Sequence, residues 1–269
     1  MAGKLIDSLA LERIEVNLFR GTSPKDRGPR IFGGHVIAQA LLAAYKTVED
    51  RPCHSIHCYF IRPGDPAVPI LYEVDRARDG RSFTTRRVTA IQHGEQIFNL
   101  AGSFQVAEDG LEHQDHIPDV PRPEAVPRDP ARDAWNREIE QRHLDPRDEA
   151  TPEKSEPIQN VWMRAVDPIG DDPVMNQVLL AYATDMSFMS TGMRPHGLNW
   201  RTPGLQTASL DHAIWFHRPS LFNHWHLFAQ TSPSASGSRG FNLGEIFDID
   251  GRLVASIAQE GLMRHRPKR

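Results

Sequence analysis

The sequence predicts an α+β protein made of two related units, each an antiparallel sheet wrapped around one buried helix. Three observations support this class. A weak internal repeat of about 110 residues indicates a duplicated domain, because solenoid repeats are only about 20 to 50 residues long. Each copy has one helical segment that is apolar on most of its faces, as a buried helix is. Each helical segment is followed by strand-like runs with turn residues between them.

The repeat is carried by four motifs that occur twice in the same order. In the first copy they are Gln39–Val48, Phe60–Pro63, Gly80–Phe83 and Gly94–Ala101. In the second copy they are Gln177–Met186, Phe216–Pro219, Gly237–Phe241 and Gly251–Ala258. Because the polar residues of the two copies differ, each copy serves as a control for the other.

The first copy begins with a polar lead-in over residues 1–30, with a short helical stretch near Leu5–Leu11. Gly33 and Gly34 then precede a helix over Val36–Tyr45. The expected strands are Ile56–Ile61, Ile70–Arg76, Ser82–Gln92 and Ile97–Val106. The breaks between these strands contain Pro-Gly-Asp, Asp-Gly and His-Gly, which are typical of turns.

The second copy starts with Val161–Ala165 and has a helix over Asp172–Asp185, whose beginning is marked by an acid followed by proline. The segment Phe188–Leu205 has no counterpart in the first copy, and we expect it to form a lid or a substrate-binding loop. The expected strands are Thr207–Phe216, His226–Thr231, Phe241–Asp248 and Leu253–Met263. The serine-rich segment Ser232–Ser238 is expected to be a flexible turn.

A proline-rich, highly charged segment separates the two copies, with one short helix expected near Ala131–Arg142. Such a composition is typical of a connection that lies over the surface. The sequence therefore predicts an N-terminal unit over residues 1–108, a linker over 109–157 and a C-terminal unit over 158–269.

Composition excludes several classes of function. The chain has 269 residues, of which 39% are hydrophobic, so it can form a real core. No apolar run approaches the roughly 18 residues that span a bilayer, and the N-terminus lacks an apolar signal region. The net charge of −4, with basic residues scattered among acidic ones, argues against nucleic-acid binding. We expect a cytoplasmic protein with no membrane or nucleic-acid partner.

Both cysteines lie in the segment Cys53-His-Ser-Ile-His-Cys58, which superficially resembles a metal-binding cluster. On a strand, Cys53 and His57 would face one side while His54 and Cys58 face the other. No second pair of Cys or His residues completes a zinc site. Five residues of strand also exceed disulfide reach. We therefore expect two reduced thiols and no metal.

Three polar residues of the second copy have no polar equivalent of the same kind in the first. Alignment of the copies places Asp185 opposite Thr47, Ser209 opposite Cys53, and Gln259 opposite Gly102. A carboxylate at the end of a buried helix opposes the helix dipole, and desolvation there would raise its pKa toward the range of a base. A carboxylate, a hydroxyl and a carboxamide can together hold one water for attack on a carbonyl. The alternative is that all three are ordinary structural polar groups.

Ordered motifs throughout both halves strongly resemble the acyl-CoA thioesterase II family. In the second half the matching stretches are Tyr182–Asp185, Ser209-Leu-Asp-His-Ala-Ile-Trp-Phe-His-Arg-Pro219, Gly237–Gly240 and Ala258–Gly261. In the first half they are Phe32–Gly34, Ala38–Leu41, His54–Phe60 and Gly80–Phe83. The resemblance covers essentially the whole chain except its proline-rich middle.

The resemblance implies two tandem hotdog folds fused as a double hotdog, with a degenerate site in the first and the live site in the second. It implies hydrolysis of fatty acyl-CoA to free acid and CoA. The family's Asp–Ser/Thr–Gln triad corresponds to Asp185, Ser209 and Gln259. We expect Asp185 to be the general base or to orient the water, with direct nucleophilic attack left open. No cofactor is implied, and the chains could pair into homodimers or homotetramers.

Four further residues are candidates for substrate binding. The N–H groups of Gly33 and Gly34 open the first helix and could polarise the thioester oxygen, or the two glycines could simply allow close packing. His57 could shape the CoA channel, and Arg239 could meet a CoA phosphate. The adjacent pair Asp211 and His212 cannot act as a dyad, because neighbours on a strand point to opposite faces.

Two alternatives compete with the hydrolase interpretation. A non-catalytic acyl-CoA-binding protein would keep the substrate tunnel without needing the triad. A hotdog enoyl-CoA hydratase would pair an Asp with a His five residues later, but Ser190 occupies that position after Asp185. The presence of all three polar residues in one copy favours the hydrolase.

Overall fold

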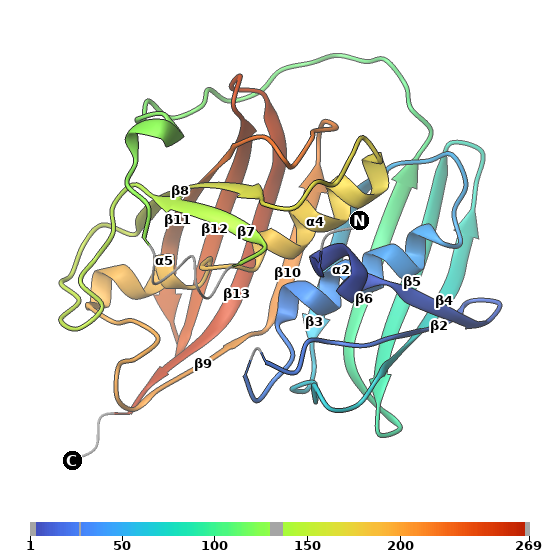
Figure 1. The fold of residues 1–269 in the computed structure, drawn as a ribbon, viewed down its shortest axis with the longest axis horizontal. Helices are drawn as coiled ribbons and strands as arrows, with labels where there is room; N and C mark the ends of the chain where they lie inside the picture. The colour runs from blue at the N-terminus through green and yellow to red at the C-terminus, as the bar shows by residue number, and fades with distance from the viewer. Residues whose placement is uncertain (1–3, 27, 130–136, 267–269) are drawn as a thin grey trace.

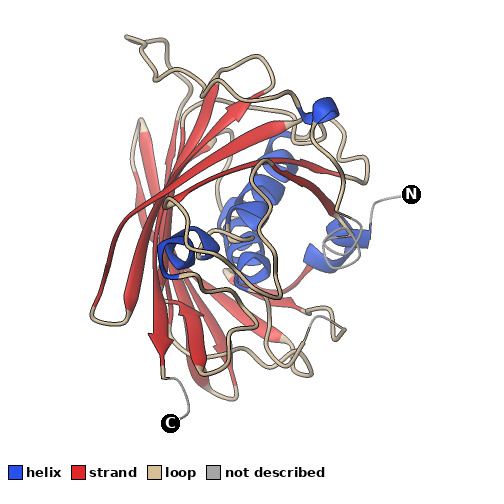
Figure 2. Cartoon of the chain, turned by 90° about the vertical axis from the view of Figure 1, so that its left-hand side faces the viewer, coloured by secondary structure: helices blue, strands red, loops and turns tan. Residues whose placement is uncertain are grey.

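The chain folds around one antiparallel sheet of 13 strands, which curves around two long helices (Figures 1 and 2). The computed structural model describes residues 4–26, 28–129 and 137–266. Its helices are α1 Lys4–Leu9, α2 Gly33–Tyr45, α4 Pro173–Thr184 and α5 Ser190–Met193, with short 3-10 turns at Pro123–Ala125 and Arg194–His196.

The strands of the first half are β1 Leu11–Glu15, β2 Leu18–Gly21, β3 Cys53–Phe60, β4 Ile70–Asp79, β5 Phe83–Gln92 and β6 Glu95–Gln105. Those of the second half are β7 Ile139–His143, β8 Ile158–Ala165, β9 Leu205–Ser209, β10 Asp211–Phe216, β11 His226–Ser236, β12 Arg239–Asp248 and β13 Leu253–His265.

The strand order is the same in both directions from the centre of the sheet. The two halves meet where β3 pairs with β10. Outward from β3 follow β6, β5, β4, β2 and β1, and outward from β10 follow β13, β12, β11, β8 and β7, while β9 pairs with β13 outside this path. In the β3–β10 register His57 faces Ala213, and the repeat makes these two residues equivalent. The two halves are therefore related by an approximate two-fold axis through this pair.

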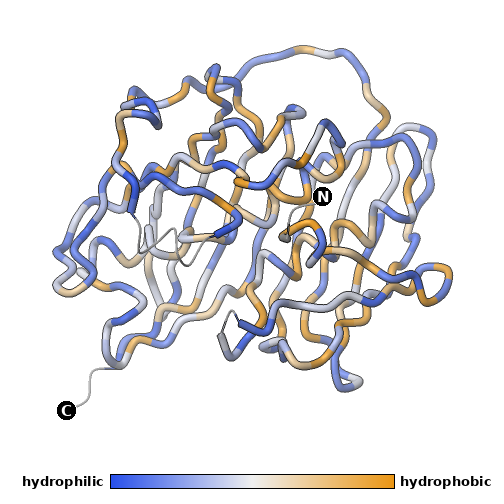
Figure 3. Tube along the Cα trace, in the orientation of Figure 1, coloured by the Kyte–Doolittle hydropathy of each residue, from blue (hydrophilic) through white to orange (hydrophobic). Residues whose placement is uncertain are grey.

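Helices α2 and α4 form the centre of the core and pack against each other. Ten of the 13 residues of α2 are buried, among them Ala38, Ala40, Ala43 and Ala44, whose small side chains let neighbouring elements approach closely. Figure 3 shows hydrophobic segments gathered around these helices, whereas the segment that follows β6 over the top of the molecule is mostly hydrophilic. Within the described ranges, every helix is too short or too polar to cross a membrane.

The predicted α+β class, both long helices and the main strands are confirmed, with bounds that differ by a few residues. The strand expected over Thr207–Phe216 is instead divided at Leu210 into β9 and β10. The helix expected near Leu5–Leu11 is α1, and the strands β1 and β2 that follow it were not predicted. Both are short, and β1 is exposed along most of its length, so neither has a strong alternating pattern.

Two local predictions are wrong. The helix expected near residues 131–142 falls partly outside the described residues, but Ile139–His143 form the strand β7, which pairs with β8. Pairing with β8 explains this, because the Glu140 carboxylate accepts a hydrogen bond from Arg164, its direct partner on β8, and another from Arg142 on its own strand. The segment expected to be a flexible turn over Ser232–Ser238 continues β11 to Ser236, and only the tip at Gly237 and Ser238 has positive φ.

Candidate active site

The end of helix α4 places a carboxylate inside the fold. Asp172 caps the start of the helix by accepting a hydrogen bond from the N–H of Val174, and Pro173 occupies the first turn. Asp185 is the C-terminal capping residue, with φ −82° and ψ −7°. Its carboxylate therefore lies at the negative end of the helix dipole and must be stabilised by other donors.

Two side chains from neighbouring strands supply those donors. Ser209, at the end of β9, donates its hydroxyl to Asp185 Oδ1 over 3.2 Å. Gln259, in the middle of β13, donates Nε2–H to the same oxygen over 2.7 Å. The pairing of β9 with β13, in which Ser209 faces Gly261, holds both strands beside the helix end. The structure thus brings together the three residues that comparison of the two copies identified.

Burial dominates the ionisation of this carboxyl group. Burial raises the pKa of Asp185 to about 6, although hydrogen bonds from Gln259, Ser209 and the backbone N–H of Gly34 oppose the rise. A group with this pKa is ionised at neutral pH and still basic enough to take a proton, which suits general base catalysis.

The two glycines at the start of α2 lie directly against the end of α4. A Cβ atom on Gly33 would lie 2.5 Å from Asp185 Oδ2, and a Cβ on Gly34 would lie 2.2 Å from the carbonyl oxygen of Tyr182. Any side chain at either position would push the two helix ends apart. The glycines therefore allow the positive end of one helix to meet the carboxylate at the negative end of the other.

The segment without a counterpart in the first copy covers one side of this site. Met189 is buried, and its sulfur lies 3.7 Å from Ser209 Oγ. A Cβ on Gly261 would lie 2.5 Å from the terminal carbon of Met189, so the glycine makes room for this side chain. Sequence reasoning expected a lid here but did not single out Met189, which carries no chemical signature.

A buried histidine braces the last turn of α4. His212 is fully buried, and its Nε2 lies 2.9 Å from the hydroxyl of Thr184, the residue before Asp185. Burial lowers the pKa of His212 to about 3, so the ring is neutral. Asp211 accepts a hydrogen bond from the N–H of Glu260, consistent with the expectation that the two neighbours serve opposite faces.

Two other candidate residues lie apart from this site. His57 is exposed and packs edge-on against Trp215 with ring centroids 5.1 Å apart. Its strand neighbour Cys58 faces the helices, so His57 faces the other side of the sheet. Arg239 forms a partly exposed ion pair with Glu260 over 2.8 Å, and Glu260 alternates with Gln259 on β13. Neither residue is brought to the triad.

Comparison with known proteins matches both halves of the chain. A family model described as acyl-CoA thioesterase matches residues 131–262, and one described as acyl-CoA thioesterase N-terminal domain matches residues 22–105. Acyl-coenzyme A thioesterase 8 of Homo sapiens is 40% identical over 97% of this chain and 88% of its own length.

Solved structures extend this likeness to the fold. An acyl-CoA thioesterase II from Mycobacterium marinum is 41% identical with a TM-score of 0.85, covering 97% of this chain and 98% of its own. A hotdog-fold protein of unknown function from Alicyclobacillus acidocaldarius has a TM-score of 0.84 at 22% identity, covering 99% of this chain and 100% of its own. The fold and the relatives define a thioester hydrolase with the hotdog fold. The chain belongs to the acyl-CoA thioesterase II family.

Proposed function

We propose that this protein hydrolyses fatty acyl-CoA to free fatty acid and CoA, using water activated by Asp185, Ser209 and Gln259. One observation carries the proposal above the others. A buried carboxylate with a pKa near 6 accepts hydrogen bonds from a hydroxyl and a carboxamide at the end of one helix, facing the start of another. This arrangement allows Asp185 to act as a general base, and membership of the family indicates that the substrate is a thioester.

The geometry assigns each side chain a task. Gln259 donates an N–H to Asp185. Because a carboxylate only accepts hydrogen bonds, this bond fixes the orientation of the Gln259 amide. Its Oε1 is buried and has no hydrogen-bond partner among the described residues, so it can accept from the attacking water. Gln259 thus orients both Asp185 and the attacking water.

In the proposed reaction one proton moves from water to Asp185 and then from Asp185 to the departing CoA thiolate. Asp185 takes a proton as the water oxygen bonds to the thioester carbonyl carbon, and the carbonyl becomes a tetrahedral oxyanion. Collapse breaks the carbon–sulfur bond, and the CoA thiolate takes the proton back from Asp185. The start of α2 presents the positive end of its dipole to this site. Because the N–H of Gly34 already donates to Asp185, we assign the stabilisation of the oxyanion to the helix dipole and the N–H of Gly33.

The architecture supports a finer description of the fold. We infer two fused hotdog units, because the strand order is mirrored about the β3–β10 junction and each half holds one long buried helix. The domain division, with a linker over residues 109–157, remains a proposal, and β7 within that range pairs with the second unit. Assembly into homodimers or homotetramers remains a proposal too. The two buried free thiols, Cys53 and Cys58, support a cytoplasmic location.

A non-catalytic acyl-CoA-binding protein would not need the triad. The cost of burying the Asp185 carboxylate favours the enzyme, because a binding protein gains nothing from it. The hydratase alternative requires a histidine five residues after Asp185, but that position is Ser190. The Ser190 hydroxyl donates to the carbonyl of Ser187.

Release of free thiol from acyl-CoAs of several chain lengths tests the proposal, with wild type beside Asp185→Asn. We expect steady turnover by wild type and a loss of about a hundredfold or more in the variant, because asparagine cannot take the proton. Turnover in ¹⁸O-labelled water under single-turnover conditions then separates the two roles of Asp185. Label in the protein carboxylate indicates an anhydride that water opens at Asp185, whereas label in the fatty acid alone shows that water attacks the acyl carbon. Wild type that binds acyl-CoA without releasing thiol would replace the enzyme with the binding protein.

A further inference from the structure

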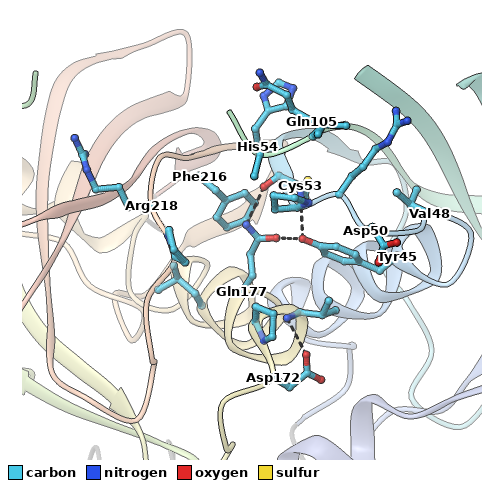
Figure 4. Close-up of a pocket in the computed structure, with 18 of the residues that line it drawn as sticks. Tyr45, Val48, Asp50, Cys53, His54, Gln105, Asp172, Gln177, Phe216 and Arg218 are labelled. Atoms are coloured by element: carbon cyan, nitrogen blue, oxygen red, sulfur yellow. Dashed lines mark hydrogen bonds between the residues drawn. The ribbon is translucent and has the colours of Figure 1, made fainter. Parts of the chain in front are cut away.

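A cavity of about 900 Å³ lies at the end of the α2–α4 pair opposite to Asp185. It is bounded by the last turn of α2, the first turn of α4, the start of β3 and the segment that follows β10 (Figure 4). Its volume is within the range of small-molecule binding sites, about 300 to 1,000 Å³. The cavity does not include any member of the triad, which lies at the other end of α4.

The approximate two-fold axis makes this cavity the counterpart of the triad site. The triad lies between the end of α4, the start of α2 and Ser209. The cavity lies between the end of α2, the start of α4 and Cys53, which the repeat aligns with Ser209. The same elements in exchanged roles thus build a second site of the same kind.

The second site cannot perform the reaction proposed for the first. The Thr47 hydroxyl donates to the carbonyl of Ala44, and the Cys53 thiol donates to the carbonyl of Ser55. Burial raises the pKa of the Cys53 thiol, which keeps it protonated. At the start of α4 the Asp172 carboxylate occupies the N–H of Val174, and Pro173 has no N–H to offer an oxyanion.

The polar groups at the base of the cavity satisfy one another. The Tyr45 hydroxyl donates to Gln177 Oε1 and accepts from the N–H of Cys53 over 2.8 Å. Gln177 Nε2 donates to the carbonyl of Cys53 over 2.9 Å (Figure 4). Because these groups already bond to one another, a hydrocarbon chain can lie against them without leaving any of them newly unpaired.

The rest of the lining suits a chain with a charged head. Apolar side chains come from both helices and from β10, namely Leu42, Val174, Leu180 and Phe216. Three basic residues also line the cavity, at Lys46, Arg51 and Arg218, together with the carboxylates Asp50, Glu108 and Asp172. Arg51 donates to the carbonyl of Gly80 and Arg218 to that of Leu253, so the exposed Lys46 is the one of these three cations without a side-chain hydrogen bond among the described residues.

We propose that this cavity is a second, non-catalytic binding site for the acyl chain of a fatty acid or an acyl-CoA, with its anionic head beside Lys46. In this proposal the first copy binds the acyl chain but lacks the residues that would hydrolyse the thioester. The proposal does not depend on the triad being catalytic, because it concerns the opposite end of α4.

Isothermal titration of the full chain with S-dodecyl-CoA, a thioether that cannot be hydrolysed, tests this directly. We expect two molecules per chain in wild type and one in Val174→Trp, whose indole fills the cavity. Lys46→Glu should weaken the second binding event about fivefold, while the equally exposed Lys154→Glu should not. Titration with dodecanoate and with CoA alone separates the head groups. Dodecanoate binding that Val174→Trp abolishes places the fatty acid in the cavity.

Three results would overturn the proposal. They are one molecule of thioether per chain in wild type, two in Val174→Trp, or binding of CoA alone as tight as that of its dodecyl thioether. Leu42→Trp fills the cavity from the opposite helix and replaces Val174→Trp if that variant unfolds early. Turnover of dodecanoyl-CoA should stay within about twofold of wild type in both variants. A large loss of turnover in these variants would show that the cavity is part of the catalytic channel. Absence of turnover by wild type would contradict the proposed hydrolysis but not the second binding site.

Discussion

The ends of the two long helices are equivalent in the repeat but carry opposite charges. At the end of α2, the guanidinium of Arg86 from β5 donates to the carbonyl and the hydroxyl of Thr47, over 3.0 and 2.9 Å. At the end of α4, the carboxylate of Asp185 lies in the same relative position. A cation complements the negative end of a helix dipole, and an anion opposes it. The first copy thus stabilises its helix end, whereas the second keeps a buried carboxylate there at a cost in stability, which the proposed catalysis would explain.

The strand positions beside the helix ends explain how each charge is tolerated. In the first copy Arg86 pairs across the sheet with Gly102, which has no side chain to offer a carboxylate. In the second copy the position of Gly102 is taken by Gln259, whose amide donates to Asp185. The comparison teaches that exchanges at the helix end and on the neighbouring strands together decide whether the helix end is capped by a cation or holds a buried carboxylate.

The largest effect on stability is expected from Arg86→Met. This change leaves the buried carbonyl and hydroxyl of Thr47 without their donor, and we expect a loss of about 3 kcal/mol in the free energy of unfolding. Chemical denaturation checks this, with Arg87→Met on the exposed face of the same strand as the control. Turnover per folded molecule should remain near wild type. Equal stability of the two variants would show that Arg86 is not the cap.

Gln259→Leu tests the second copy, in which the helix end carries Asp185. The variant removes the donor that orients Asp185, and we expect a loss of about a hundredfold in kcat, the usual cost of removing one preorganised donor. Steady-state thiol release measures it. Gln206→Leu is the matched control, because Gln206 is an exposed glutamine on β9. A loss confined to KM would assign Gln259 to substrate binding instead.

Comparison of the copies singled out the three residues that the structure brings together, because each stands out against Thr47, Cys53 or Gly102 in the other copy. Their catalytic role stays a prediction. The role of Arg86 could not be predicted in this way. An arginine looks like a solvent-facing residue by its charge, although alternation along β5 places Arg86 on the same buried face as Val88 and Ala90. The strand β7 was misread for a related reason, since its pairing with β8 outweighs its local helix propensity. Short local patterns fail where long-range pairing decides the structure.

The stability of the protein should respond to pH in the direction that a buried base predicts. The pKa of Asp185 is about 6 when folded and 3.8 without its surroundings, so the folded state holds the proton longer. This site therefore destabilises the fold progressively as pH rises from about 4 to 6. Asp185→Asn removes the penalty and should raise the free energy of unfolding at pH 7 by about 2 kcal/mol. Denaturant titrations at pH 4.5 and 7 check this. A variant less stable than wild type at pH 7 would contradict the assigned pKa.

The smallest effect is expected at Ser209, where the first copy has a thiol. Ser209→Ala removes one of the hydrogen bonds to Asp185, the longer of the two side-chain bonds at 3.2 Å, and we expect a loss of about tenfold in kcat. Ser209→Thr keeps the hydroxyl and should retain most of the activity. Ser209→Cys installs the residue of the other copy, and its weak S–H donor should give a rate close to that of alanine. Thiol release by the three variants at one pH orders them, and a cysteine variant as active as threonine would mean that loss of the hydroxyl did not silence the first copy.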